Sequence, residues 1–380
     1  MTRRFVVYGV GGVGKTTVSA ALAVALAKSG RSTLVVTTDP ARRLADTLGV
    51  EATAEIAPVA WCPGLDCYMP ESRQTPREVA AELLAGHPEI AAGLIDNPVF
   101  ELLCSGLAGV HELALLATLG PRAATYDAVV VDTAPSRHAL DLVSLPGRIG
   151  RLLDSRSLQW LGRIAHRGTR RTLTQRVLDW GQEKLVGRFE KALGQGAVSD
   201  TLGVLNAIMT IRPRLAETIR LAGDLLTGPA TEHLVVLAPR HGATHEARFF
   251  ETVLTAIARP PSTWLVNRAV ENIPDWALEL ADTPDLAPDL AEAVALVIAE
   301  SRLAIDCARD AVAAVLSVAP RARVDLIPAI ERATPTEVVL GVADRLARLF
   351  ALTGPALSPS VERVDVDRRV GARAVRLEGF

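Results

Sequence analysis

Aromatic residues are scarce in this chain of 380 residues, at 4% of the total, and there are only four cysteines and three methionines. Hydrophobic residues make up 49% and charged residues 22%, so the core must consist mainly of alanine, valine and leucine, and disorder of the whole chain is excluded. No apolar run reaches the roughly 18 residues that a membrane-spanning helix needs. We therefore expect a globular, cytoplasmic protein without a transmembrane segment.

The sequence also lacks an excess of charge and a pattern of paired cysteines. Lys and Arg number 41 against 43 Asp and Glu, so there is no basic excess that would bind nucleic acid through its phosphates. We expect no nucleic-acid partner. Only Cys62 and Cys67 lie close together, and no Cys-x-x-Cys pair occurs. A disulfide framework and a structural zinc site are both disfavoured.

Short runs of apolar and β-branched residues alternate with helical segments along the chain. Several runs are apolar throughout, which is typical of strands buried on both faces of a parallel sheet. A helical segment, Thr16–Lys28, separates the first two. The alternation predicts an α/β fold with a doubly wound, mostly parallel sheet. The predicted strands are Phe5–Tyr8, Thr33–Thr38, Ala128–Val131, Leu234–Ala238, Thr263–Val266 and Val324–Ile327.

Two stretches carry no strand signal. Residues 76–119 have a helical pattern, and Pro88 and Pro98 are the expected helix boundaries within them. Residues 148–226 show apolar positions near helical spacing. We interpret both as helical insertions that form a subdomain on one edge of the sheet, within a single domain over residues 1–350.

A glycine-rich loop follows the first predicted strand and opens the first predicted helix. Gly9 to Thr16 fit the pattern G-x-x-x-x-G-K-[ST] in the strand–loop–helix context that makes it meaningful. Such a loop turns backbone N–H groups around a phosphate, and the helix N-terminus adds partial positive charge. Lys15 is expected to neutralise β- and γ-phosphate oxygens and the Thr16 hydroxyl to bind Mg²⁺. The predicted nucleotide contacts are Gly9, Gly11, Gly12, Val13, Gly14, Lys15, Thr16 and Thr17.

Two carboxylates follow predicted strands, at the edge of the sheet where ligands of such folds bind. Asp39 comes after the second predicted strand and Asp132 directly follows the third. Asp132 suits Mg²⁺, which leaves Asp39 available to orient or deprotonate the water that attacks the γ-phosphate. The sequence therefore predicts Lys15 and Asp39 as catalytic residues, and Thr16 and Asp132 as the metal site.

These stretches together resemble the ArsA/GET-type ATPases, which include arsenite-pump ATPases and targeting factors for tail-anchored membrane proteins and are related to ParA and MinD. The resemblance rests on the phosphate loop, on Thr38–Ala41 and on Asp132–Pro135 with the residues that follow it to Pro146. It implies a dimer that closes over two ATP molecules. It also implies that Asp39 belongs to switch I and Asp132 to switch II.

Two further positions are assigned by the same resemblance. Asn267 would contact adenine, and Pro328 would lie beside the base. The implied cofactors are ATP and Mg²⁺, and the implied partners are a second ATPase chain and a client protein.

The chain departs from the family pattern at Val10. Family members usually carry a lysine there, which reaches the nucleotide of the partner subunit, and a charge-assisted contact of that kind is expected to matter greatly in phosphoryl transfer. Arg42 or Arg43 could substitute for it, or a related partner chain could supply it in a heterodimer. The methionine-rich groove of the targeting factors and the clustered cysteines of the arsenite-pump members are missing as well.

The expected function is Mg²⁺-dependent ATP hydrolysis, with closure of a dimer coupled to a client or partner protein. One alternative is a weakly hydrolysing regulatory subunit of a heterodimer whose partner carries the lysine. A second is a positioning switch like ParA or MinD, which would need an amphipathic membrane anchor. Residues 355–380, interpreted as a mobile or partner-binding tail, lack a convincing apolar face. A role in an arsenite pump would rest on kinship alone.

Overall fold

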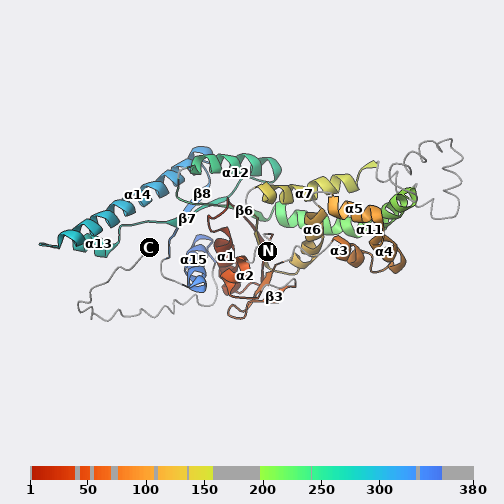
Figure 1. The fold of residues 1–380 in the computed structure, drawn as a ribbon, viewed down its shortest axis with the longest axis horizontal. Coiled ribbons are helices and arrows are strands. Elements are labelled where there is room, and N and C mark those ends of the chain that lie inside the picture. Colours follow the sequence, from red (N-terminus) through yellow and green to blue (C-terminus); the bar gives the residue numbers. More distant parts are fainter. Residues whose placement is uncertain are drawn as a thin grey trace.

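An eight-stranded sheet forms the centre of the molecule (Figure 1). Its strands lie in the order β3-β4-β2-β5-β1-β6-β7-β8, and every pair is parallel except β3 with β4. The predicted fold class is confirmed. The strands are β1 (Arg3–Tyr8), β2 (Thr33–Thr37), β3 (Ala57–Pro58), β4 (Leu65–Tyr68), β5 (Ala128–Asp132), β6 (Thr231–Leu237), β7 (Thr263–Ala269) and β8 (Arg323–Pro328). The computed structural model describes residues 2–38, 43–51, 55–69, 76–106, 110–134, 137–156, 197–240, 242–330 and 334–352.

All six predicted strands are present, and most extend one to three residues further than the apolar runs. β3 and β4 were not predicted, because β3 has only two residues and Asp66 interrupts the apolar pattern of β4. Pro88 and Pro98 begin helices as predicted, since the first turn of a helix has no use for the N–H that proline lacks. The helices are α1 (Lys15–Lys28), α2 (Arg43–Leu48), α3 (Pro76–Leu83), α4 (Pro88–Ile95), α5 (Pro98–Gly106), α6 (Val110–Ala123), α7 (Arg137–Leu153), α11 (Ala197–Thr227), α12 (Ala243–Ile257), α13 (Asp275–Ala281), α14 (Pro288–Val318) and α15 (Pro335–Leu349).

Helices cover both faces of the sheet because successive strand residues point to opposite sides. In β1, Phe5 and Val7 pack into one apolar cluster with α1, α2 and α15, while Val6 and Tyr8 pack into a second with α7, α11 and α12. α1 is buried almost all round, which explains why its sequence shows so little polar character. The phosphate loop is thereby attached to a strand and a helix that are both largely buried.

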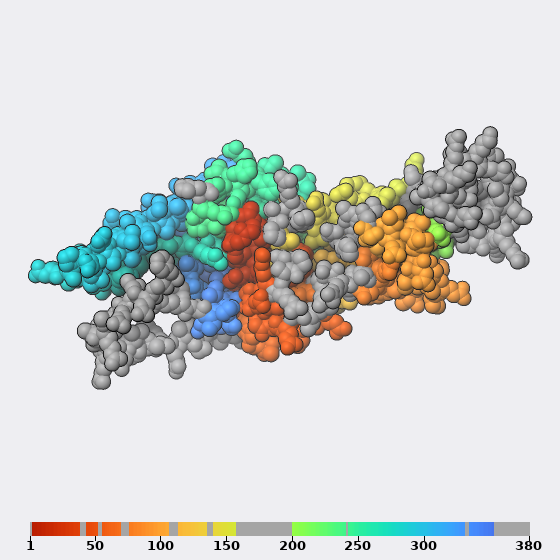
Figure 2. Space-filling model, viewed as in Figure 1, coloured from red at the N-terminus to blue at the C-terminus, as the bar shows by residue number. Residues whose placement is uncertain are grey.

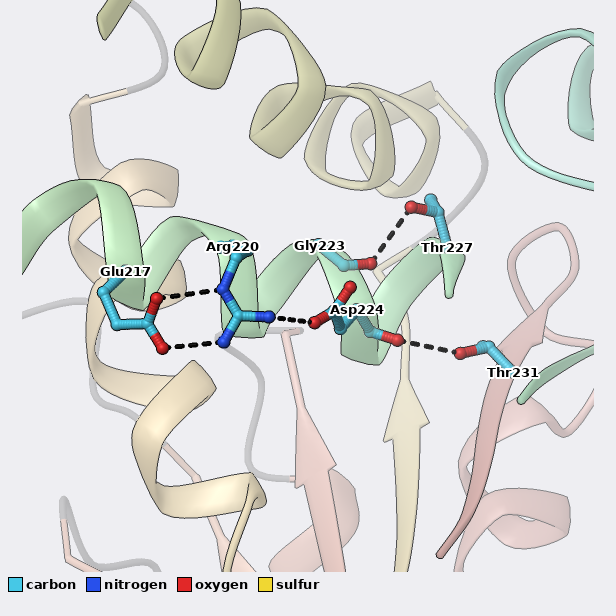
Figure 3. Close-up of polar contacts among 6 residues, drawn as sticks. All are labelled: Glu217, Arg220, Gly223, Asp224, Thr227 and Thr231. Atoms are coloured by element: carbon cyan, nitrogen blue, oxygen red, sulfur yellow. Dashed lines mark hydrogen bonds and ion pairs between the residues drawn. The ribbon is translucent and has the colours of Figure 1, made fainter. Parts of the chain in front are cut away.

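The two predicted helical insertions meet in one layer built around α11. This helix of 31 residues packs along α6 and α7 and also contacts α3, α4 and α5. Its far end contacts β1 and β6, so the layer joins the sheet at central strands and not at a terminal strand. The joint is closed by a hydrogen bond from Thr231 Oγ1, at the start of β6, to the carbonyl oxygen of Asp224, and ion pairs link Arg220 to Glu217 and Asp224 nearby (Figure 3).

The molecule is elongated, with α13 and the first part of α14 at one end and α3 to α5 towards the other (Figure 2). Within the described ranges, no helix combines the length and the apolar character needed to cross a lipid bilayer.

Candidate active site

The glycine-rich loop follows β1 at the carboxyl edge of the sheet and lies against the ends of β6 and β7. A Cβ atom on Gly9 would lie 2.5 Å from the carbonyl oxygen of Val236 in β6, and a Cβ on Gly14 would overlap the side-chain amide of Asn267 in β7. Gly14 also has a φ of +88°, a left-handed conformation that favours glycine. Neighbouring strands therefore press on the loop closely enough to require glycine at both ends.

Lys15, the first residue of α1, is buried with 6% of its surface exposed. Its Nζ donates a hydrogen bond to the carbonyl oxygen of Val10 at 3.1 Å, so the ammonium lies against the loop. An anion bound by the loop N–H groups would meet this charge directly. The Val10 side chain, at the position where a lysine was expected from the resemblance, packs partly buried against both apolar clusters.

Asp132, the last residue of β5, is buried, with 1% of its surface exposed. Thr16 Oγ1 donates to its Oδ2 at 2.9 Å, Thr37 Oγ1 to the same oxygen at 3.3 Å, and Ser19 Oγ to Oδ1 at 3.1 Å. Burial raises the pKa of Asp132 to about 6, and the hydroxyl donors and Lys15 oppose that rise. The three donors hold the carboxylate in a fixed orientation beside Thr16.

Thr16 and Asp132 have the chemistry that a hard divalent cation needs. The Thr16 hydroxyl uses its hydrogen on Asp132 and keeps its lone pairs for a cation. Asp132 supplies negative charge within hydrogen-bonding distance of the same hydroxyl. The chemistry of these two residues therefore fits Mg²⁺.

Ser19 and Thr37 were not among the predicted site residues. Ser19 is fully buried in α1, one turn after Thr16, and it is a hydroxyl on an otherwise apolar stretch of helix. That lone polar residue at i+3 from Thr16 is the signal that could have identified it. Thr37 ends β2 next to β5 and needed the strand pairing to be known.

The Ser19→Ala variant should lose stability in a pH-dependent way. It removes the Oδ1 donor and so raises the pKa of Asp132 further. The free energy of unfolding should fall by about 1–3 kcal/mol at pH 8 and by less at pH 4, where the carboxyl is protonated in both proteins. Urea unfolding at the two pH values measures this. Ser29→Ala, at the far end of α1 with its hydroxyl on the Leu26 carbonyl, should show a loss independent of pH; an equal pH dependence in both variants would contradict the assignment.

The remaining predicted residues lie around the same edge where the structure describes them. Asn267 donates from Nδ2 to the carbonyl oxygen of Val13 at 2.8 Å, and Pro328 ends β8 in the adjacent strand. Gly11, Gly12 and Thr17 lie in the loop and in the first turn of α1. Asp39 and Arg42 lie outside the described residues, as does the 355–380 tail, and Arg43 begins α2. Thr38, which precedes Asp39, is anchored by its N–H to the Asp132 carbonyl oxygen at 2.9 Å.

Residues 2–175 match the family model described as anion-transporting ATPase. The arsenical pump-driving ATPase of Acidiphilium multivorum is 30% identical over 151 residues, 39% of this chain and 26% of that protein. An arsenical pump-driving ATPase of Escherichia coli is 28% identical over 151 residues, which again are 39% of this chain and 26% of that protein. ATPase get3 of Aspergillus terreus is 33% identical over 140 residues, 36% of this chain and 41% of that protein. The matches thus span a quarter to two-fifths of these relatives.

Proposed function

We propose that this chain, whose residues 2–175 match the model of the anion-transporting ATPases, is an ArsA/GET-type ATPase that binds Mg²⁺ and ATP and hydrolyses the γ-phosphate bond. The observation that carries the proposal is the hydrogen-bonded set of Thr16, Ser19, Thr37 and Asp132 beside the phosphate loop. Asp132 forms no direct ion pair with any of the described side chains, and a buried carboxylate in that situation is costly. A cation at Thr16 would compensate for that cost.

Each residue of this set has a separate part in the proposed hydrolysis. The loop N–H groups and the Lys15 ammonium bind the β- and γ-phosphates, and fixed donors of that kind stabilise charge that develops on the phosphoryl oxygens. Thr16 and Asp132 would hold Mg²⁺, which supplies further neutralisation of phosphate charge when bound. Asp39 is proposed to position the attacking water. Asn267, 5% exposed and bonded to the loop, is proposed to read the base next to Pro328.

We further propose that the active form is a dimer, whose closing and opening change what the helical layer around α11 binds. The chain itself offers no lysine at Val10, and the Val10 side chain is part of the packing of two apolar clusters. This favours a heterodimer with a lysine-bearing relative as the second candidate, in which this chain acts as the weakly hydrolysing regulatory subunit. The proposal does not extend to this chain what the named relatives pump or target.

ATP turnover by the purified chain, measured over a wide range of protein concentration, tests the proposal. If the chain forms its own active dimer, turnover per chain should rise with concentration, and Asp39→Asn should abolish it. A chain that binds ATP but stays inert at every concentration would support the heterodimer instead. Failure to bind ATP with Mg²⁺ by calorimetry would overturn the proposed function itself.

A further inference from the structure

A cavity lies at the opposite edge of the sheet from the phosphate loop. It has a volume of about 720 Å³ and opens at the amino ends of β6 and β7, beside the carboxyl end of α14. Cavities of this size hold small ligands. Four prolines line it, namely Pro229, Pro260, Pro261 and Pro320, and their restricted backbones make the walls of the cavity rigid.

The lining residue His233 presents one ring nitrogen without a partner. His233 is 1% exposed, its Nδ1 lies 3.0 Å from Tyr8 Oη, and its Nε2 has no hydrogen-bond partner among the described residues. Burial raises the pKa of Tyr8 and lowers the pKa of His233 to about 4, so both side chains are neutral near pH 7. His233 Nδ1 is the one hydrogen-bond partner of the Tyr8 hydroxyl among the described residues, so donation from the hydroxyl to Nδ1 leaves fewer polar groups unpaired than the reverse and places the imidazole proton on Nε2. A buried N–H without an acceptor is costly, and a ligand oxygen would remove that cost.

The charged side chains around His233 are of both signs. Arg259 and Arg321 line the cavity, and neither forms an ion pair within the described part of the chain. Glu251 of α12 lines it too, and its buried Oε2 has no hydrogen-bond partner in the same part. Glu232, the other acidic lining residue, is already paired with Arg3 at 2.9 Å. Two cations and a neutral donor are thus left for an anionic group, and one carboxylate for a cationic group.

We propose that this cavity binds a small zwitterion of the amino-acid type. Its carboxylate would lie between Arg259, Arg321 and His233 Nε2, and its ammonium group would pair with Glu251. His233 Nε2 and Glu251 Oε2 are both enclosed in this structure, so side chains at the mouth of the cavity, such as the exposed Arg259 with its 3.5 Å bond to the Pro229 carbonyl oxygen, have to move as the ligand enters. A simple carboxylate or phosphate would leave Glu251 facing a second anion, and a simple amine would leave His233 Nε2 without an acceptor. The site is separate from the phosphate loop and stands whether or not the chain hydrolyses ATP.

To test this, the whole chain of 380 residues is titrated with each of the twenty standard amino acids in the absence of nucleotide. Calorimetry and ligand-observed NMR measure the binding. At least one amino acid should bind saturably. Glu251→Gln and Arg259→Ala should each weaken that binding about tenfold or more, because each removes a charged hydrogen-bond partner. Arg248→Ala, an exposed arginine of the same helix as Glu251 but outside the cavity lining, should leave the affinity unchanged.

Sodium acetate, inorganic phosphate and methylammonium are the competitors that define the ligand class. None of them alone should displace the bound amino acid at equal concentration. Displacement by acetate or phosphate, with Glu251→Gln without effect, would overturn the zwitterion in favour of a plain anion site. Absence of binding by all twenty amino acids at millimolar concentration would overturn the proposal. Circular dichroism of the parent chain and of each variant shows whether the fold is intact, so that a loss of binding is not mistaken for a loss of folding.

Discussion

Replacing Asp132 by asparagine should lower ATP turnover by roughly 10²–10³-fold and at the same time make the nucleotide-free protein more stable at pH 8. The loss of activity follows from removing the negative charge beside the Thr16 hydroxyl, on which the proposed Mg²⁺ site depends. The gain in stability follows from burial, because this carboxylate is enclosed and forms no direct ion pair within the described part of the chain.

The sign of the pH effect follows from the direction of the pKa shift. The pKa of Asp132 rises from 3.8 in an ordinary environment to about 6 in the folded chain, so the folded state holds the proton more tightly than the unfolded state does. The contribution of this group to stability is therefore complete below pH 4 and is lost as the pH rises through about 6. About two pKa units correspond to about 3 kcal/mol, and the three hydroxyl donors can turn to accept from an amide.

Urea unfolding of the parent chain and of Asp132→Asn at pH 4 and pH 8 measures this effect. The two proteins should be nearly equally stable at pH 4, and the variant should be more stable by about 1–3 kcal/mol at pH 8. A variant less stable than the parent at pH 8 would mean that the hydroxyls of Thr16, Ser19 and Thr37 stabilise the carboxylate by more than burial destabilises it. Asp127→Asn is a suitable control, since Asp127 is exposed and its pKa is lowered instead by its bonds to Ser32.

The parts of this fold that sequence predicted well are those encoded locally. A buried parallel strand needs a short apolar run, and the phosphate loop needs glycines, Lys15 and Thr16 in consecutive positions, so both are visible without knowledge of the rest of the chain. The pairing of Thr16 with Asp132 was expected from the rule that carboxyl ends of parallel strands share one edge. Hydrogen bonds from Ser19 and Thr37 depend on the register between α1, β2 and β5, which no local pattern contains.

The contacts that sequence could not predict join segments far apart in the chain. The bond from Asn267 to Val13 spans 254 positions, and that from Tyr8 to His233 spans 225. Asn267 was assigned by resemblance to the base, and its hydrogen bond to the loop became visible only once β7 was placed two strands from β1. Likewise, the cavity around His233 is formed by the starts of β6 and β7 and the end of α14, and each of those segments looks like an ordinary turn in sequence.

The Gly14→Ala variant should lose at least about 100-fold in ATP affinity, and the reason can be separated into two parts. A Cβ at Gly14 is placed in a left-handed conformation, at a cost of about 1–2 kcal/mol, and it also overlaps the Asn267 amide that holds the Val13 carbonyl. The loop must shift to relieve the overlap, and its N–H groups then point away from the phosphates that they are proposed to bind.

Two neighbouring glycines provide matched controls for this variant. Gly12 has a φ of +82° with nothing within 4 Å of an added Cβ, and Gly11 has free space as well and no left-handed φ. ATP affinity measured by calorimetry should therefore decrease little in Gly11→Ala, moderately in Gly12→Ala and most in Gly14→Ala. In an Asn267→Ala background, which removes the overlapping amide, the further loss caused by Gly14→Ala should shrink to that of Gly12→Ala. If Gly14→Ala cost the same in both backgrounds, the contact with Asn267 would have no part in shaping the loop, and backbone conformation alone would explain the glycine.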